Sequence, residues 1–172
     1  MNNNLLEPNS YELNKLLKHY QNSELVEAEK LALTITKKFP NHSFSWKVLG
    51  SIYEKTERKS KALIAKQKAI AINPKDAEAY CNLGNTFQDL ARLSEAEESF
   101  REAIKLKPDF AEAFNNLGNT LRILGKEIEA EICYRKAISL KDNFAEAYNN
   151  LAKILHDLGK LEEAQENYKR AL

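Results

Sequence analysis

Three asparagines recur at one interval along the chain: Asn82, Asn116 and Asn150. Asparagine is unfavourable inside a helix because its side chain competes for backbone hydrogen bonds, so its recurrence at helical positions indicates a role in contacts. A side-chain amide offers both a donor and an acceptor, so it can pair with a peptide group whatever side chain that residue bears. The chemistry suggested by this amide row is capture of a polypeptide backbone. Inheritance from one duplicated ancestral unit is the alternative explanation.

Other polar residues share the predicted helical face of the amide row. Val48 takes the equivalent place in an earlier segment and interrupts the row there. We expect the peptide backbone to be held by asparagines and its side chains to be selected by neighbouring residues. The remaining members of the predicted binding face are Asn85, Gln88, Asp89, Asn119, Arg122, Lys153, His156 and Asp157.

No arrangement typical of catalysis is found in the sequence. It has no glycine-rich phosphate loop, no nucleophile elbow and no HExxH motif. His156 with Asp157 could form an acid and base pair, but no nucleophile lies at a defined spacing from them. Cys81 and Cys133 are far apart and form no CxxC pair, which predicts two small packed thiols. We therefore expect no enzyme activity, no metal and no cofactor.

The elements that carry these residues are internal repeats. The segment of 34 residues that begins at Ala77 is followed, without insertion or deletion, by a second that begins at Ala111. Apolar residues recur at helical spacing within each segment, with a break near Gly125 in the second. Each segment is therefore predicted to form two antiparallel helices, and a period of this length is typical of a stacked array.

The same register extends in both directions from these two segments. We predict a flexible lead over residues 1–8 and an array over residues 9–172. The expected fold is all-α, an α–α superhelix (solenoid) of stacked helical hairpins, with an atypical first repeat acting as a cap. The five predicted units span residues 9–42, 43–76, 77–110, 111–144 and 145–172.

The spacing of bulky, small and aromatic residues resembles the tetratricopeptide repeat. In the third unit the pattern consists of Tyr80, Leu83-Gly84, Phe87, Ala96, Phe100, Ala103 and Pro108. The setting of the amide row is similar to the repeat arm of the protein O-GlcNAc transferases and to related bacterial arms. That resemblance implies that the first helix of each unit lines a concave groove, where Asn82, Asn116 and Asn150 would grip an extended peptide.

The geometry of stacked helices agrees with such a role. Neighbouring helices pack roughly 8–10 Å apart, whereas an extended chain advances about 3.3–3.6 Å per residue. One asparagine per repeat would therefore meet every third residue of a bound peptide. Replacing the three row asparagines together by alanine is expected to abolish binding and to leave the melting temperature unchanged or raised, because alanine is the better helix former.

The packing of each hairpin is predicted from a column of small residues: Gly50, Gly84, Gly118 and Ala152. A side chain at these positions would push the two helices of one hairpin apart. Asp109 with Glu112, and Asn143 with Glu146, are predicted to form capping boxes. The second helix of the second unit is expected to present a solvated basic surface. That surface consists of Arg58, Lys59, Lys61, Lys66 and Lys68.

Overall composition narrows the classes of partner. The formal net charge is +1, from 26 basic and 25 acidic residues, which favours neither nucleic acid nor an acidic membrane surface. The opening residues have no basic segment and no apolar run typical of a secretory signal. No stretch approaches the roughly 20 apolar residues of a membrane span. The sequence thus predicts a cytoplasmic protein whose partner is a protein or peptide.

The carboxyl-terminal unit carries aliphatic residues on the side predicted to meet a further repeat. These are Ala147, Ile154, Leu158 and Leu172. Because an array normally ends in a polar face, we expect this end to be covered by further repeats or by a homodimer contact with a second chain.

Three functions are consistent with these patterns. The first is a non-enzymatic interaction scaffold that binds an extended peptide in its groove. The second is the substrate-recruiting arm of a larger enzyme, such as a glycosyltransferase or sulfotransferase. The third is a structural repeat protein that assembles with itself.

Overall fold

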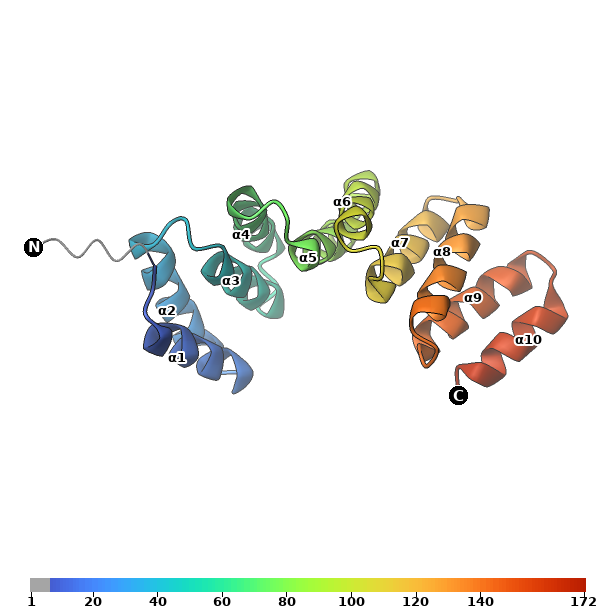
Figure 1. The fold of residues 1–172 in the computed structure, drawn as a ribbon, viewed down its shortest axis with the longest axis horizontal. Coiled ribbons are helices and arrows are strands. Elements are labelled where there is room, and N and C mark those ends of the chain that lie inside the picture. Colours follow the sequence, from blue (N-terminus) through green and yellow to red (C-terminus); the bar gives the residue numbers. More distant parts are fainter. Residues whose placement is uncertain (1–6) are drawn as a thin grey trace, which may run out of the picture. The chain divides into compact units, whose positions relative to one another are not determined.

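The computed structural model describes residues 7–172, so most of the predicted lead lies outside the described residues. Within that range the chain forms ten α-helices and no β-strand (Figure 1). The all-α prediction is confirmed, and each of the five predicted repeats contains two helices. The helices are α1 (Ser10–Gln21), α2 (Leu25–Lys38), α3 (Ser43–Lys55), α4 (Lys59–Ile72), α5 (Ala77–Asp89), α6 (Leu93–Leu106), α7 (Ala111–Ile123), α8 (Glu127–Leu140), α9 (Ala145–Asp157) and α10 (Leu161–Arg170).

The chain divides into two compact units, Met1–Ala79 and Tyr80–Leu172, and the division falls within α5. In the first unit α3 packs on α4, and α2 packs on both α1 and α3. In the second unit α7 packs on α8 and α9 on α10, while α8 also contacts α9. Each unit is thus a stack in which a helix contacts its hairpin partner and the next repeat.

The turn inside each hairpin is made by a residue with left-handed backbone geometry. Gly125 has φ +74°, and its N–H donates to the Arg122 carbonyl while the Lys126 N–H donates to that of Leu121. This pair of bonds is the Schellman closure, which glycine adopts without a Cβ penalty. Gly159 adopts the same φ, and Ala91 has φ +55° at the equivalent turn of the third unit; the break predicted near Gly125 is confirmed.

The predicted capping boxes of α7 and α9 are wrong. These helices begin after Phe110 and Phe144, and neither has a side-chain cap hydrogen bond. Their carboxylates are used between helices instead. Glu112 pairs with Lys141 at 2.9 Å, and Glu146 accepts a hydrogen bond from Asn115 at 2.9 Å. Both glutamates therefore bind side chains outside their own helix instead of capping it.

The small-residue column is confirmed as a packing requirement at Gly84 and Gly118. A Cβ added at Gly118 would lie 2.6 Å from the Tyr134 ring, and one at Gly84 would lie 2.6 Å from the Phe100 ring. Both rings are fully buried. In these two repeats the second helix thus places an aromatic ring so close to the backbone of the first helix that a Cβ would overlap it.

Lys66 departs from the predicted basic surface. It occupies the repeat position of Phe100 and Tyr134, and it is 4% exposed. Its aliphatic stem lies against Gly50, while its ammonium group pairs with Glu54. A lysine can pack its methylene groups and still satisfy its charge. Arg58 is also paired within the chain. Its two terminal guanidinium nitrogens donate to the Glu29 carboxylate, and the bond from Nη1 is 2.7 Å long.

A recurring ion network links successive second helices in the Tyr80–Leu172 unit. Lys126 and Arg101 both bind Glu97, each at 2.8 Å, and Arg101 also reaches Glu129 at 2.9 Å. Burial raises the pKa of Glu97, but the hydrogen bonds from Lys126 and Arg101 outweigh it, so the pKa lies below its usual value. The same pattern recurs one repeat later in a set made up of Glu131, Lys160, Arg135 and Glu163.

The carboxyl-terminal contact surface is not as predicted. Ala147 and Ile154 are 0% and 1% exposed, so they are buried within the chain itself and the prediction is wrong for these two residues. They are buried because α9 packs against α7, α8 and α10. Leu158 is half-buried, and Leu172 is fully exposed. An end contact through Leu172 stays a prediction.

Candidate functional site

The amide row lies on the first helices of the Tyr80–Leu172 unit, one member on each of α5, α7 and α9. Asn82 is exposed, whereas Asn116 and Asn150 are each partly buried. The sequence-predicted face therefore reaches solvent along all three helices. Asn116 and Asn150 also have hydrogen-bond partners on neighbouring helices.

Asn116 is held by the preceding repeat. Its Nδ2 donates to Oδ1 of Asn85 at 3.0 Å and lies 4.0 Å from the Cys81 sulfur. Gln88 is also turned toward this helix, since its Nε2 donates to the Thr120 hydroxyl at 2.8 Å. Asn85 and Gln88 thus join α5 to α7, which gives them a structural role.

Asn150 is held by a residue that the sequence reasoning did not single out. Its Nδ2 donates to Oδ1 of Asn115 at 3.1 Å, and Asn115 in turn donates to Glu146 at 2.9 Å. Asn115 is 1% exposed, so its carbonyl depends on this donor. The available signal was the double asparagine at 115–116 and 149–150, whose first member also recurs at the repeat interval, although the third unit has Cys81 there.

Asn119 completes the set of tethered amides. Its Oδ1 accepts a hydrogen bond from the Tyr134 hydroxyl at 2.8 Å. Burial raises the pKa of Tyr134 to about 12, despite the opposing influence of nearby Arg122. The tyrosine therefore remains a neutral donor at physiological pH and fixes the orientation of the Asn119 amide.

The carboxyl end of the face is open and charged. Lys153, His156 and Asp157 are exposed, as is Arg122 one repeat earlier. His156 Nδ1 lies 3.5 Å from Asp157 Oδ1, and both side chains are more than 60% exposed. These groups are open to solvent, so they do not isolate a reacting atom from water.

These contacts revise the expected effect of removing Asn150. Asn150→Ala should lower the free energy of unfolding by about 1–3 kcal/mol, because the buried Asn115 carbonyl loses its donor. The earlier expectation of an unchanged or raised melting temperature neglected this bond. Urea unfolding followed by circular dichroism would measure the change, with Lys153→Ala, at an exposed position on the same helix, as the control. Equal stability of the two variants would contradict the structural role.

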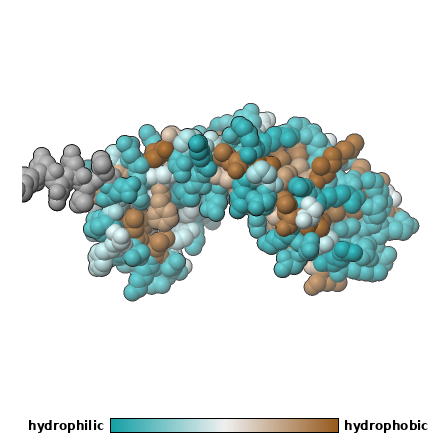
Figure 2. Space-filling view, in the orientation of Figure 1, coloured by the Kyte–Doolittle hydropathy of each residue, from teal (hydrophilic) through white to brown (hydrophobic). Residues whose placement is uncertain are grey.

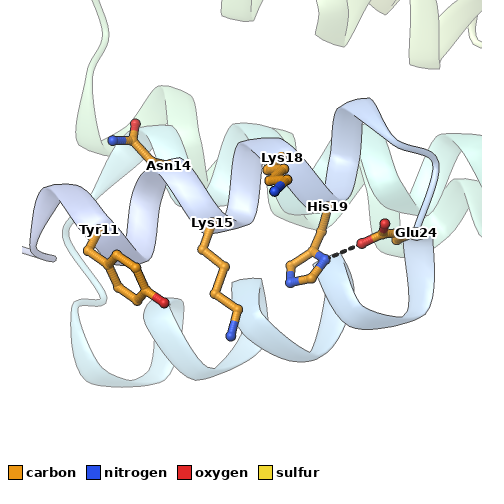
Figure 3. A pocket seen from close by; sticks show the side chains of 6 residues that line it. All are labelled: Tyr11, Asn14, Lys15, Lys18, His19 and Glu24. Atoms are coloured by element: carbon orange, nitrogen blue, oxygen red, sulfur yellow. Dashed lines mark hydrogen bonds and ion pairs between the residues drawn. The ribbon is translucent and has the colours of Figure 1, made fainter.

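A separate cavity of about 430 Å³ lies on α1 in the Met1–Ala79 unit. Figure 3 shows Tyr11, Lys15 and His19 on one side of the helix and Asn14 on the other. His19 pairs with Glu24, and this hydrogen bond holds the pKa of that carboxyl below its usual value. Asn14 also lines this cavity, as do Lys18 and Glu24.

Two further hollows lie between second helices of the Tyr80–Leu172 unit and were not predicted. One lies between α6 and α8, has a volume of about 430 Å³ and includes Ile104, Phe114 and Ile132. The other lies between α8 and α10, has a volume of about 520 Å³ and includes Ile138, Tyr148 and Glu166. The second set follows the first at the repeat interval. These are called the α6–α8 hollow and the α8–α10 hollow.

The remaining chemistry is limited. Within residues 7–172 no group of three metal-ligating side chains lies together, and no helix is long and apolar enough to cross a membrane. Cys81 and Cys133 are unlinked and buried. Burial raises the pKa of Cys133 to about 11, so this thiol stays protonated near neutral pH.

Models of the tetratricopeptide repeat match residues 77–110 and 109–172, and a related TPR repeat model matches residues 60–91. Together they span residues 60–172, which contain the whole amide row. The chain belongs to the tetratricopeptide repeat family. Members of this family are protein-interaction scaffolds, and the stacked hairpins described above provide such a scaffold. A search of curated proteins found no match.

Solved structures with the same fold align with most of this tetratricopeptide repeat chain. MamA is 25% identical, with a TM-score of 0.84 over 90% of each chain. PilF of Pseudomonas aeruginosa is 20% identical, with a TM-score of 0.86 over 94% of this chain and 73% of that one. YrrB, described as a TPR protein with an unusual peptide-binding site, is 19% identical, with a TM-score of 0.78 over 93% and 82%.

Proposed function

We propose that this tetratricopeptide repeat protein binds an extended peptide along the polar face of α5, α7 and α9. The observation that carries the proposal is that Asn116 and Asn150 are both tethered and partly open to solvent. A tethered side chain loses little conformational freedom when a ligand binds, so its hydrogen bonds contribute more to affinity.

The valences of the amides are compatible with a peptide ligand. A primary amide can donate two hydrogen bonds and accept two. Asn116 uses one N–H for Asn85, and Asn150 uses one for Asn115. Within the described residues, each therefore retains acceptor capacity at Oδ1 that a peptide N–H can fill. Asn82, exposed on α5, extends the same row.

The exposed charges would set which peptide is preferred. Arg122 and Lys153 are cationic residues near the middle and the end of the face, with Asp157 beyond them. A peptide with acidic side chains opposite Arg122 and Lys153 would gain charge-assisted hydrogen bonds. Gln88 is withdrawn from this selective role by its bond to Thr120. The peptide-binding site described for YrrB supports the use of this fold for such a ligand.

The proposal is tested with peptides selected on the full chain from a random display library. Selected peptides should bind Asn116→Ala at least about twofold more weakly than wild type, since one or two hydrogen bonds of about 0.5–1.5 kcal/mol each are lost. Isothermal titration measures the affinity. Lys136→Ala, an exposed change on α8, is the matched control and should bind as wild type does.

The result that would refute the groove is equally specific. Peptides that bind wild type and Asn116→Ala with the same affinity would place their site elsewhere on the molecule. A melting curve for Asn116→Ala separates loss of binding from loss of fold. We expect the fold to persist, because Asn85, the partner of Asn116, is itself only partly buried and can turn to water.

A further inference from the structure

The cavity on α1 is lined at positions that are buried in the later repeats. Ala113 and Leu117 on α7 are 0% and 2% exposed. At the same repeat positions α1 has Tyr11 and Lys15, both of which are exposed and line the cavity. On the face seen in Figure 2, hydrophilic residues cover much of the Met1–Ala79 unit. A terminal repeat commonly has a polar outer face, so polarity alone does not identify a site here.

The two lysines of this cavity are not paired with acidic groups. Within the described part of the chain, neither Lys15 nor Lys18 has a hydrogen bond or an ion pair. Glu24 lines the same cavity, but its carboxylate is bound by His19 and by the Asn22 amide. The pKa of that carboxyl lies below its usual value, chiefly because of the His19 hydrogen bond. Two lysine charges therefore stand against one carboxylate that already has partners.

The two lysines are neighbours on the surface of α1. Residues three apart on a helix lie next to each other, so the charges of Lys15 and Lys18 repel. Figure 3 shows Lys18 between two edges of the cavity, with Asn14 on one and Tyr11, Lys15 and His19 on the other. Neither Tyr11 nor Asn14 has a hydrogen bond from its side chain within residues 7–172. An anion seated on both lysines would relieve their repulsion.

We propose that this cavity binds the phosphate group of a small organic phosphate monoester, with Lys15 and Lys18 contacting the phosphate oxygens. A phosphate monoester carries a charge of about −1.5 to −2 near pH 7 and has three strong acceptor oxygens. A carboxylate carries one charge, so the phosphate is the better match for two adjacent ammonium groups. The Tyr11 hydroxyl and the Asn14 amide lie at the edges of the cavity, where they can contact the organic part of the ligand.

The size of the cavity favours a small ligand. Its volume of about 430 Å³ exceeds what a bare phosphate ion needs. It lies within the range of roughly 300–1,000 Å³ that is typical of small-molecule sites. All the lining residues come from α1 and the turn that follows it. An extended peptide that crosses several repeats would need a longer surface than this.

The helix dipole indicates where the phosphate would lie. Lys18 and His19 are in the last turn of α1, where the carbonyl end of a helix favours cations. Their presence therefore has a local explanation. Lys15 and Tyr11 lie before the last turn and have no such explanation. Because the same dipole repels an anion, we expect the phosphate to lie between Lys15 and Lys18 and away from His19.

Titration of the isotope-labelled full chain with phenyl phosphate, followed by NMR, tests the proposal. Amide signals of α1 should shift with a dissociation constant of about 0.1–10 mM at low salt, because exposed charge pairs are weak. The double variant Lys15→Ala, Lys18→Ala should bind at least about fivefold more weakly. Its melting temperature should equal or exceed that of wild type, since both positions are exposed. Benzoate, with one charge, should bind at least about threefold more weakly than phenyl phosphate.

A matched control removes the same charge elsewhere. Lys61→Ala, Lys68→Ala, at exposed positions on α4, should bind phenyl phosphate as wild type does. Equal loss of binding in both double variants would show general charge attraction and would overturn the proposal. Unshifted α1 signals, or benzoate bound as tightly as phenyl phosphate, would overturn it as well. The last probe is a short peptide with one phosphoserine. If it binds at least about tenfold more tightly than phenyl phosphate, the ligand is a protein segment and the proposal of a small ligand is wrong.

Discussion

Tyr134→Ala should lower the free energy of unfolding by about 3–5 kcal/mol, the cost of removing a large buried aromatic ring. Tyr134 is fully buried, its ring lies against Gly118 and its hydroxyl donates to Asn119. The cavity would open between the two helices of one hairpin, where the Tyr134 ring lies against Gly118. Urea unfolding followed by circular dichroism measures the effect.

The matched control lies one repeat later. Tyr168 occupies the equivalent position on α10, but it is 38% exposed. Tyr168→Ala should therefore cost less than about 1 kcal/mol. A second variant, Tyr134→Phe, keeps the ring and removes only the bond to Asn119, so its cost should be about 1 kcal/mol. Similar losses for Tyr134→Ala and Tyr168→Ala would show that burial of the ring is not what stabilises the hairpin.

Gly118→Ala should destabilise the protein although alanine is the better helix former. Helix propensity alone would favour alanine by about 1 kcal/mol. The added Cβ would lie 2.6 Å from the buried Tyr134 ring, and relieving that overlap should cost about 1–3 kcal/mol beyond this gain. The net effect is a lower midpoint of unfolding, which thermal melting detects.

The control for this substitution exists within the chain. The fifth repeat has Ala152 at the position of Gly118, and its aromatic partner position is the half-exposed Tyr168. In the variant Gly118→Ala, Tyr134→Ala the overlap is absent, so adding the methyl group should no longer be destabilising. An increase in stability for Gly118→Ala in the wild-type background would contradict the close approach of ring and backbone.

The sequence predicted the fold well because its repeat interval constrains every element at once. Gly84 and Gly118 marked the close contact between helices, and Gly125 marked a turn. These positions depend on backbone geometry that few residues tolerate, so residue type alone identifies them. Ala91 stands at the equivalent turn of the third unit and has the same positive sign of φ.

Contacts between repeats were not predictable in the same way. Periodicity marked Asn116 and Asn150 but gave no indication that they bind Asn85 and the buried Asn115. Glu146 looked like a capping residue because local spacing cannot reveal a partner from another helix. Lys66 looked solvated because its charge, not its aliphatic stem, dominated the pattern.

The recurring ion network has a consequence for the length of the array. Arg101 binds Glu129 and Lys126 binds Glu97 between the third and fourth repeats, and the equivalent residues pair between the fourth and fifth. Consider a duplicated copy of residues 111–144 inserted after residue 144. Glu129 of the inserted copy would meet Arg135 of the original, as Glu163 does now, and Asn116 of the copy would meet the original Asn115, as Asn150 does now. Every partner would be renewed at the new junction. This part of the chain is therefore a module that could be lengthened by whole repeats while each junction keeps its specific contacts.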